Sequence, residues 1–302
     1  MGKSDRTGVE AIPRVSVRGG SRLWRLDGFL RLSRKVPRLL IYGFIGFVLV
    51  LAIVGPLLAP HDPLEQHLNQ IFAQPSGRFW LGTDELGRDV LSRTIAGART
   101  AVVGATVITL GGLLIGIPLG LIAGYRGGRV DAVISRGADF MIAIPALLVA
   151  IVVVGVLGGG YWMAVALLVV LQSPFETRLA RSGTLEQRGL PYVEAARTLG
   201  ISQWRIMGRH IFPNLLSVIV PNAALTFTYA LVTLAGLAFL GLGVSPGQPD
   251  WGLMIAENRV GLFSNAWATL TPALMLMLLA TSVSFLGDLL YEAFQDRGAG
   301  NE

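Results

Sequence analysis

The sequence has no cysteine and little charge. Among its 302 residues there is no Cys, and Asp, Glu, Lys and Arg together make up 15%. The missing cysteine excludes a disulfide scaffold, a thiolate metal site and a cysteine nucleophile. Soluble domains carry about 25% charged residues, so the low charge indicates a chain whose solvent is largely lipid. Histidine is scarce too: His61, His67 and His210 are too scattered to favour a metal site over solvated loops.

A phosphate-binding loop is also missing. No stretch matches G-x-x-x-x-G-K-[ST], the pattern that cradles nucleotide phosphates. We therefore expect no ATP hydrolysis by this chain, no catalytic residues and no bound cofactor or metal. The net charge of +6 lies in short segments between apolar runs. Because no single basic face results, we expect no nucleic-acid partner.

What the sequence does contain is long runs without charge. Residues 39–59 form a charge-free run of 21 residues, enough to cross roughly 30 Å of hydrocarbon as a helix. The run 140–175 is divided by three glycines at 158–160, which predicts two spans joined by a tight turn. With the runs 101–124, 218–242 and 267–287, the pattern predicts an all-α bundle of six membrane spans.

The distribution of Lys and Arg predicts the orientation of these spans. With both termini inside, twenty of the 25 basic residues fall in inner segments and five in outer loops, as the positive-inside rule requires. We therefore expect both termini to be cytoplasmic. The predicted organisation is a basic N-terminal tail (1–38), a first span (39–59), an extracytoplasmic loop (60–98), a five-helix core (99–290) and a C-terminal tail (291–302).

One polar segment, residues 177–214, interrupts the apolar core, and it predicts two short helices. Pro191 suits the first turn of the first helix, and Glu194 lies near its positive N-terminal end. Gly200 fits the left-handed residue that ends a helix. Ser202 then caps a second helix, which should stop before Pro213.

The spacing in this segment resembles a known motif. Glu194, Ala195, Ala196 and Gly200 form E-A-A-x-x-x-G, and Pro213 follows thirteen positions after the glycine. This resembles the cytoplasmic EAA loop of ABC-importer permeases, where it docks on the ATP-hydrolysing subunit. The resemblance implies an ATPase-coupling site made of Tyr192, Glu194, Ala195, Ala196, Arg197, Gly200, Ser202, Trp204 and Pro213.

The two largest outer loops carry a second resemblance. The strings LGTDELGRDVLSR and AFLGLGVSPGQPDWG are similar to the dipeptide/oligopeptide/nickel subgroup of these permeases. The resemblance implies an outer mouth that docks a binding protein, with candidate residues Asp84, Arg88, Asp89, Pro246, Pro249 and Trp251.

The residues themselves predict how this mouth is built. Thr83 or Asp84 should cap a helix that runs through Arg93, with solvated charges pairing along it. Trp251 is expected to anchor the loop at the lipid interface. The carboxylates Asp139 and Glu176 lie near predicted cytoplasmic span ends, so we expect them to reach towards Arg136 or Arg178.

The resemblance implies one of two translocation subunits of an ATP-driven importer in a bacterial inner (plasma) membrane. The implied partners are a homologous permease in a heterodimer, two ATPase subunits that bind ATP and Mg²⁺, an extracytoplasmic binding protein and the lipid bilayer. Dipeptides or oligopeptides are the leading substrates; nickel or a metal chelate, glutathione or another small peptide-like solute remain open. A secondary transporter fits less well because no pair of internal halves is evident, and an intramembrane enzyme lacks a nucleophile or metal-ligand set.

Overall fold

The computed structural model describes residues 38–158 and 160–299. Most of the predicted basic tail, residues 1–37, and the last three residues therefore lie outside the described part of the chain. The described residues fold into helices with the following bounds: α2 Arg38–Leu58, α3 Val90–Arg126, α4 Gly128–Ala143, α5 Ala146–Leu157, α6 Gly160–Arg188, α7 Pro191–Thr198, α8 Gln203–Arg205, α9 Phe212–Phe239, α10 Trp251–Asn258 and α11 Trp267–Ala299, with short 3₁₀ turns at Leu68–Gln70 and Arg259–Gly261 and a π-helical turn at Ile206–Ile211.

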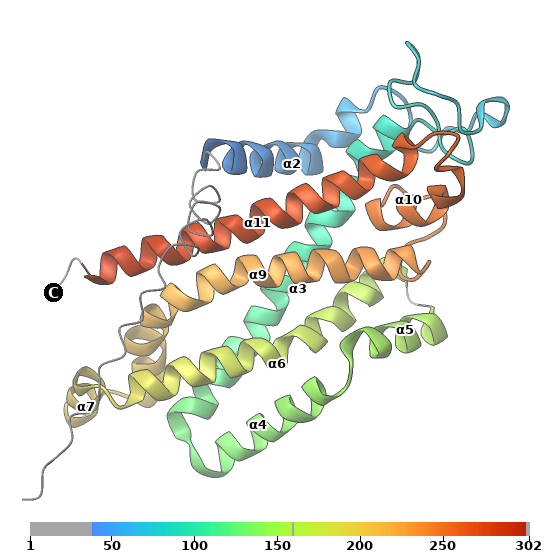
Figure 1. Ribbon diagram of the computed structural model, residues 1–302. Helices are drawn as coiled ribbons and strands as arrows, with labels where there is room; N and C mark the ends of the chain where they lie inside the picture. Colours follow the sequence, from blue (N-terminus) through green and yellow to red (C-terminus); the bar gives the residue numbers. More distant parts are fainter. Residues whose placement is uncertain (1–37, 159, 300–302) are drawn as a thin grey trace, which may run out of the picture. The chain divides into compact units, whose positions relative to one another are not determined.

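These helices confirm the predicted all-α membrane fold. In the described residues, five helical stretches are long and apolar enough to cross a membrane, and the pair α4 and α5, bent by 76° at a short break, makes a sixth. The bend falls at Ile144, which is extended, and Pro145, because proline restricts its predecessor to the extended region. Figure 1 shows α2, α11, α9 and α6 side by side, with α3 crossing behind them.

Helix α3 is the central element of the bundle, and its glycines allow it to pack closely against α6. It runs for 37 residues, about 55 Å at 1.5 Å per residue, and it packs along α6 for much of that length. A Cβ atom on Gly116 would lie 2.5 Å from the Cβ of Glu176, and one on Gly124 would lie 2.7 Å from that of Thr184. Such distances leave no room for a side chain, so the glycines let the two backbones meet.

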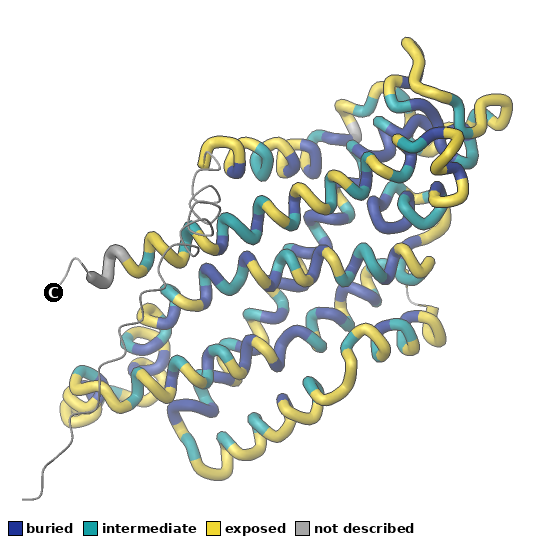
Figure 2. The backbone as a smooth tube through the Cα atoms, in the orientation of Figure 1, coloured by how far each residue is buried: buried dark blue, intermediate teal, exposed yellow. Residues whose placement is uncertain are grey.

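The apolar core of the described residues has three parts, the smallest of which contains Ala238, Val244 and Leu253. The largest part joins α2, α3, α6, α9 and α11 around residues such as Ile108, Leu168 and Leu231. A smaller cluster packs α7 and the π-helical turn against the ends of α3 and α9, and includes Val193, Ile206 and Leu215. Figure 2 shows the buried faces of the spans turned towards each other, while α4 and most of α2 are exposed.

The second helix of the polar segment differs from its prediction. It does not stop before Pro213: α8, the π-helical turn and α9 form one helical stretch, Gln203–Phe239. In an α-helix the ring of Pro213 would clash with the carbonyl four residues earlier. The π-helical turn just before it changes the register, since the N–H of Phe212 bonds to the oxygen of Met207, and the side chain of Asn214 bonds to the oxygen of His210 at 2.9 Å.

Candidate functional site

The polar segment presents one face of α7 to solvent. Val193 and Ala196 are buried against the chain, while Glu194, Ala195 and Arg197 are exposed. Pro191 begins α7, and Gly200 follows it with φ of 73°, so the left-handed residue predicted at the helix end is present. Ser202 is at the N-cap of α8, but its side chain makes no capping hydrogen bond.

Helix α7 is tied to the ends of three spans. The hydroxyl of Tyr192 donates to Gln187 at the end of α6 at 2.7 Å and accepts from Asn214 in α9 at 3.1 Å. The Nε of Arg197 donates to the hydroxyl of Tyr125 in α3 at 3.2 Å, and its guanidinium stacks on that ring. These hydrogen bonds connect α7 directly to α3, α6 and α9.

Trp204 precedes Met207 by three positions and Ile211 by seven, the spacing of one face of an α-helix. Those two are buried, but Trp204 is 62% exposed, and its ring lies 5.2 Å from the guanidinium carbon of Arg126. Trp204 therefore belongs to the free surface of the polar segment. Pro213, which lies nine positions after Trp204 at the start of α9, is also exposed.

At the other end of the bundle, the predicted mouth holds a buried ion cluster, which corrects the expectation of solvated charges. Asp84, Arg88 and Arg93 are at most 1% exposed. Arg88 contacts Asp84 at 2.7 Å and Glu257 at 2.9 Å, and Arg93 contacts the same two carboxylates at 3.3 and 3.1 Å. Burial raises the pKa of neighbouring Glu85, and repulsion from Glu257 is the second-largest cause of the increase.

The cluster fastens two loops that lie far apart in sequence. Arg93 donates to the carbonyl of Gly247 at 2.9 Å, and Glu257 accepts from the N–H of Gly247 at 3.2 Å. Asn265 donates to the carbonyls of Leu81 and Thr83, both at 3.0 Å. The segments before α3 and around α10 are thus one rigid unit.

Two other expectations for the mouth were wrong. The cap of α3 is Asp89, which is buried and accepts from Ser92, so neither Thr83 nor Asp84 begins this helix. Trp251 is fully buried and donates from its indole to Thr94 at 2.8 Å, so it fills the core rather than anchoring at lipid. Of the six candidate docking residues, Pro246 is exposed and Pro249 is half-buried; the other four have their side chains inside the chain.

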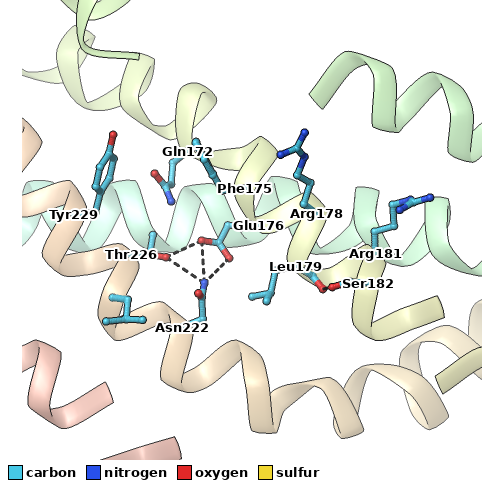
Figure 3. A pocket seen from close by; sticks show the side chains of 11 residues that line it. Gln172, Phe175, Glu176, Arg178, Leu179, Arg181, Ser182, Asn222, Thr226 and Tyr229 are labelled. Carbon is cyan, nitrogen blue, oxygen red and sulfur yellow. Dashed lines mark hydrogen bonds between the residues drawn. The ribbon is translucent and has the colours of Figure 1, made fainter. Parts of the chain in front are cut away.

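A pocket of about 840 Å³ opens between α6 and α9. Its most buried charged lining residue is Glu176, whose carboxylate accepts from Thr226 at 2.7 Å and from Asn222 at 3.2 Å (Figure 3). Glu176 was expected to reach towards an arginine at the span end. That expectation was wrong for Glu176 and right for Asp139, which contacts Arg178 at 2.5 Å.

Comparison with known families decides what this architecture is. The model for the inner membrane component of binding-protein-dependent transport systems matches residues 116–297, and that for the N-terminal transmembrane domain of oligopeptide transport permease C matches residues 23–75. The chain belongs to this family of ABC-importer permeases. It is therefore a multi-pass inner-membrane permease subunit of the peptide-transporter type, and not an enzyme.

Relatives of this permease share most of its length. It is 36% identical over 278 residues to a dipeptide transport system permease protein from Alkalihalophilus pseudofirmus, covering 91% of this chain and 90% of the relative. It is 35% identical to a glutathione transport system permease protein from Pectobacterium atrosepticum, covering 84% and 85%.

A solved structure supports the fold of the permease. The chain matches a chain in an inward-facing form of the MetNI methionine ABC transporter with a TM-score of 0.55 and 18% identity, covering 67% of this chain and 96% of that one.

Sequence reasoning missed two features of the site: Glu257, which is the partner of Arg88 and Arg93, and the α6–α9 pocket. Both depend on contacts between helices that no local spacing encodes.

Proposed function

We propose that this permease pairs with a homologous permease and two ATPase subunits to import dipeptides or oligopeptides delivered by an extracytoplasmic binding protein. The curated relatives named for dipeptide transport support the substrate class. ATP and Mg²⁺ would bind to the ATPase subunits, since the chain has no phosphate-binding loop.

The observation that carries the proposal is the divided surface of α7. Its buried face and its hydrogen bonds to Gln187, Asn214 and Tyr125 hold it to the bundle. Its other face leaves Glu194, Ala195 and Leu199 exposed, the last at 79%. A short helix held firmly on one side and free on the other suits docking into a groove of an ATPase.

The orientation follows from charge. The polar segment carries six arginines and the N-terminal residues 1–38 carry ten Lys and Arg, so by the positive-inside rule both lie in the cytoplasm. Closure of the ATPases on ATP would then displace α7. Through its bonds to three spans, α7 would move the permease between inward-facing and outward-facing states as a hinge motion of packed helices.

A second substrate, glutathione, is favoured by one observation, the 35% identity to a glutathione permease. Glutathione is itself a peptide, so the same assembly and coupling would serve it. Uptake of a radiolabelled dipeptide and of radiolabelled glutathione by the same reconstituted importer, each with its binding protein, distinguishes the two.

Two substitutions in the polar segment test the coupling. Glu194→Lys puts a positive charge at the helix N-terminus, against the dipole. Gly200→Val forces a β-branched residue into a left-handed conformation, a strain of about 1–3 kcal/mol, although nothing lies within 4 Å of the position of its Cβ. We expect uptake to fall in both, with the ATPases either dissociated or hydrolysing ATP without import.

Matched controls separate coupling from folding. Gly189→Val adds the same side chain at an exposed glycine that has no positive φ and no neighbour within 4 Å, and Arg129→Ala removes a charge from the first turn of α4. We expect both to import normally. Wild-type uptake by the two coupling variants, with the ATPases bound, would show that residues 194–200 are only a connecting loop.

A further inference from the structure

The α6–α9 pocket contains a carboxylate in an unusual setting. Glu176 lies well inside α6, sixteen residues from Gly160 and twelve from Arg188, and it is only 1% exposed. Ionisable residues at membrane depth are costly and usually mark a functional site or pathway. Its position at the edge of an 840 Å³ pocket sets it apart from a carboxylate sealed in the core.

The hydrogen-bond partners of Glu176 are neutral. Its two oxygens accept from the amide of Asn222 at 3.4 and 3.2 Å and from the hydroxyl of Thr226 at 2.7 Å. Figure 3 shows these groups converging on the carboxylate from α9. They hold the carboxylate in one orientation but do not balance its charge.

The nearest arginines are committed to other carboxylates. Arg178 pairs with Asp139 at 2.5 Å, and Arg181 contacts both oxygens of Asp131 at 2.5 and 2.7 Å. Within the described part of the chain, Glu176 takes part in no ion pair. The pocket therefore contains a fixed, oriented carboxyl group with room beside it for a cation.

The rest of the pocket suits a small solute with amide groups and short side chains. Gln172 and Ser182 add hydrogen-bonding groups, while Phe175, Leu225 and the ring of Tyr229 add apolar surface. These three apolar residues are each 44% exposed or more, so they form the open rim. Arg178 and Arg181 also line the pocket, each paired with a carboxylate outside it. A few fixed polar and charged groups set among apolar side chains are the usual arrangement of a ligand pocket.

We propose that the α6–α9 pocket binds the cargo inside the membrane, with Glu176 receiving the positively charged amino terminus of a peptide. Asn222 and Thr226 are positioning residues that orient the carboxylate. The inference rests on the proposed peptide import and adds to it a binding site within the permease, distinct from the binding protein.

The competing explanation is structural: a carboxyl group that only links α6 to α9 through hydrogen bonds. Glu176→Gln separates the two explanations. The glutamine retains an oxygen that can accept from Asn222 and Thr226 but carries no charge, so a structural link survives and a cation site does not. Glu176→Asp retains the carboxyl group, and Glu292→Gln is the matched control, since it makes the same substitution at an exposed position of α11 outside the pocket lining.

The first test measures uptake of radiolabelled alanyl-alanine by the complete importer in proteoliposomes, with the binding protein saturated. We expect Glu176→Gln to lower the uptake rate about tenfold, as when a charge-assisted hydrogen bond to the cargo becomes neutral. We expect Glu176→Asp to retain more activity than Glu176→Gln, and Glu292→Gln to match wild type. Full activity of Glu176→Gln, in an importer whose wild type transports the dipeptide, overturns the pocket and leaves peptide import standing. A wild type that imports no peptide overturns both.

The second test does not depend on transport. Because the chain has no cysteine, Leu225→Cys places a single thiol of this subunit on the exposed rim of the pocket. In the assembled importer made with cysteine-free partner subunits, we expect a cationic methanethiosulfonate reagent to modify it several-fold faster than an anionic one of similar size. The preference should shrink when Glu176→Gln is added and persist when Glu292→Gln is added. A preference that Glu176→Gln leaves unchanged overturns the proposal.

Discussion

Asp250 combines two opposing effects in one side chain. Its carboxylate caps α10 by accepting from the N–H groups of Gly252 and Leu253 at 2.9 and 3.2 Å, which is stabilising. It is also only 3% exposed, and burial raises its pKa above the ordinary value of an aspartate. The folded state therefore binds a proton more tightly than the unfolded state, so stability is greatest below the unfolded pKa and is lost as pH rises through the folded pKa.

This predicts a pH-dependent effect of Asp250→Asn. The amide oxygen can still cap α10 but has no charge to desolvate, so we expect the variant to gain stability relative to wild type as pH rises from about 4 to 7. Asp250→Ala, which loses the cap, should cost about 1 kcal/mol at low pH. Thermal unfolding of the purified permease across this pH range measures both differences in stability. A stability difference between Asp250→Asn and wild type that does not change with pH would contradict the prediction.

At the residue scale, the sequence predicted positions better than environments. The left-handed Gly200 and the exposed Glu194 are where their local chemistry places them. Arg88 and Arg93 were misread as solvated, because their partner Glu257 lies 169 and 164 residues away. A buried ion pair requires knowledge of both partners, and only the tertiary fold supplies the second.

At the scale of elements, the same contrast holds. Charge-free runs predicted the spans because length and hydropathy decide whether a helix crosses lipid. The bend of 76° between α4 and α5 and the continuation of α8 through Pro213 into α9 were not predicted. Both depend on local backbone adjustments, an extended Ile144 before Pro145 and a π-helical turn before Pro213.

The glycine contacts of α3 give a prediction at this scale. A Cβ on Gly120 would lie 2.5 Å from the backbone oxygen of Thr177 and 2.6 Å from the Cβ of Ala180. Gly120→Leu must therefore push α3 away from α6, and we expect it to destabilise the permease by about 1–3 kcal/mol.

The control for this prediction is Gly137→Leu on α4, where the glycine is exposed and nothing lies within 4 Å of the added Cβ. Thermal unfolding in detergent compares the two variants. A melting temperature for Gly120→Leu equal to that of Gly137→Leu would show that α3 and α6 are not held in contact as described.

At the scale of the whole molecule, the fold fixes which segments share a side of the membrane, and charge fixes which side that is. The loop before α3 contains the exposed Ser76, and the polar segment after α6 contains the exposed Ser202. Ile201 and Gln203 share a cavity with Tyr125 and Arg126 at the end of α3, while Ser76 precedes its beginning. The length of α3, 37 residues, therefore separates the two serines.

This separation predicts opposite labelling of two single-cysteine variants. In intact cells, an impermeant thiol reagent should modify Ser76→Cys from outside, and Ser202→Cys only after the membrane is opened. The wild type provides the blank, since the sequence has no cysteine. Labelling of both from outside would contradict the placement of α3 as a span. Labelling of Ser202→Cys alone from outside would mean that the bundle is intact but oriented the other way in the membrane. The assignment of α7 to the ATPases would then be wrong, because ATP is hydrolysed only on the cytoplasmic side.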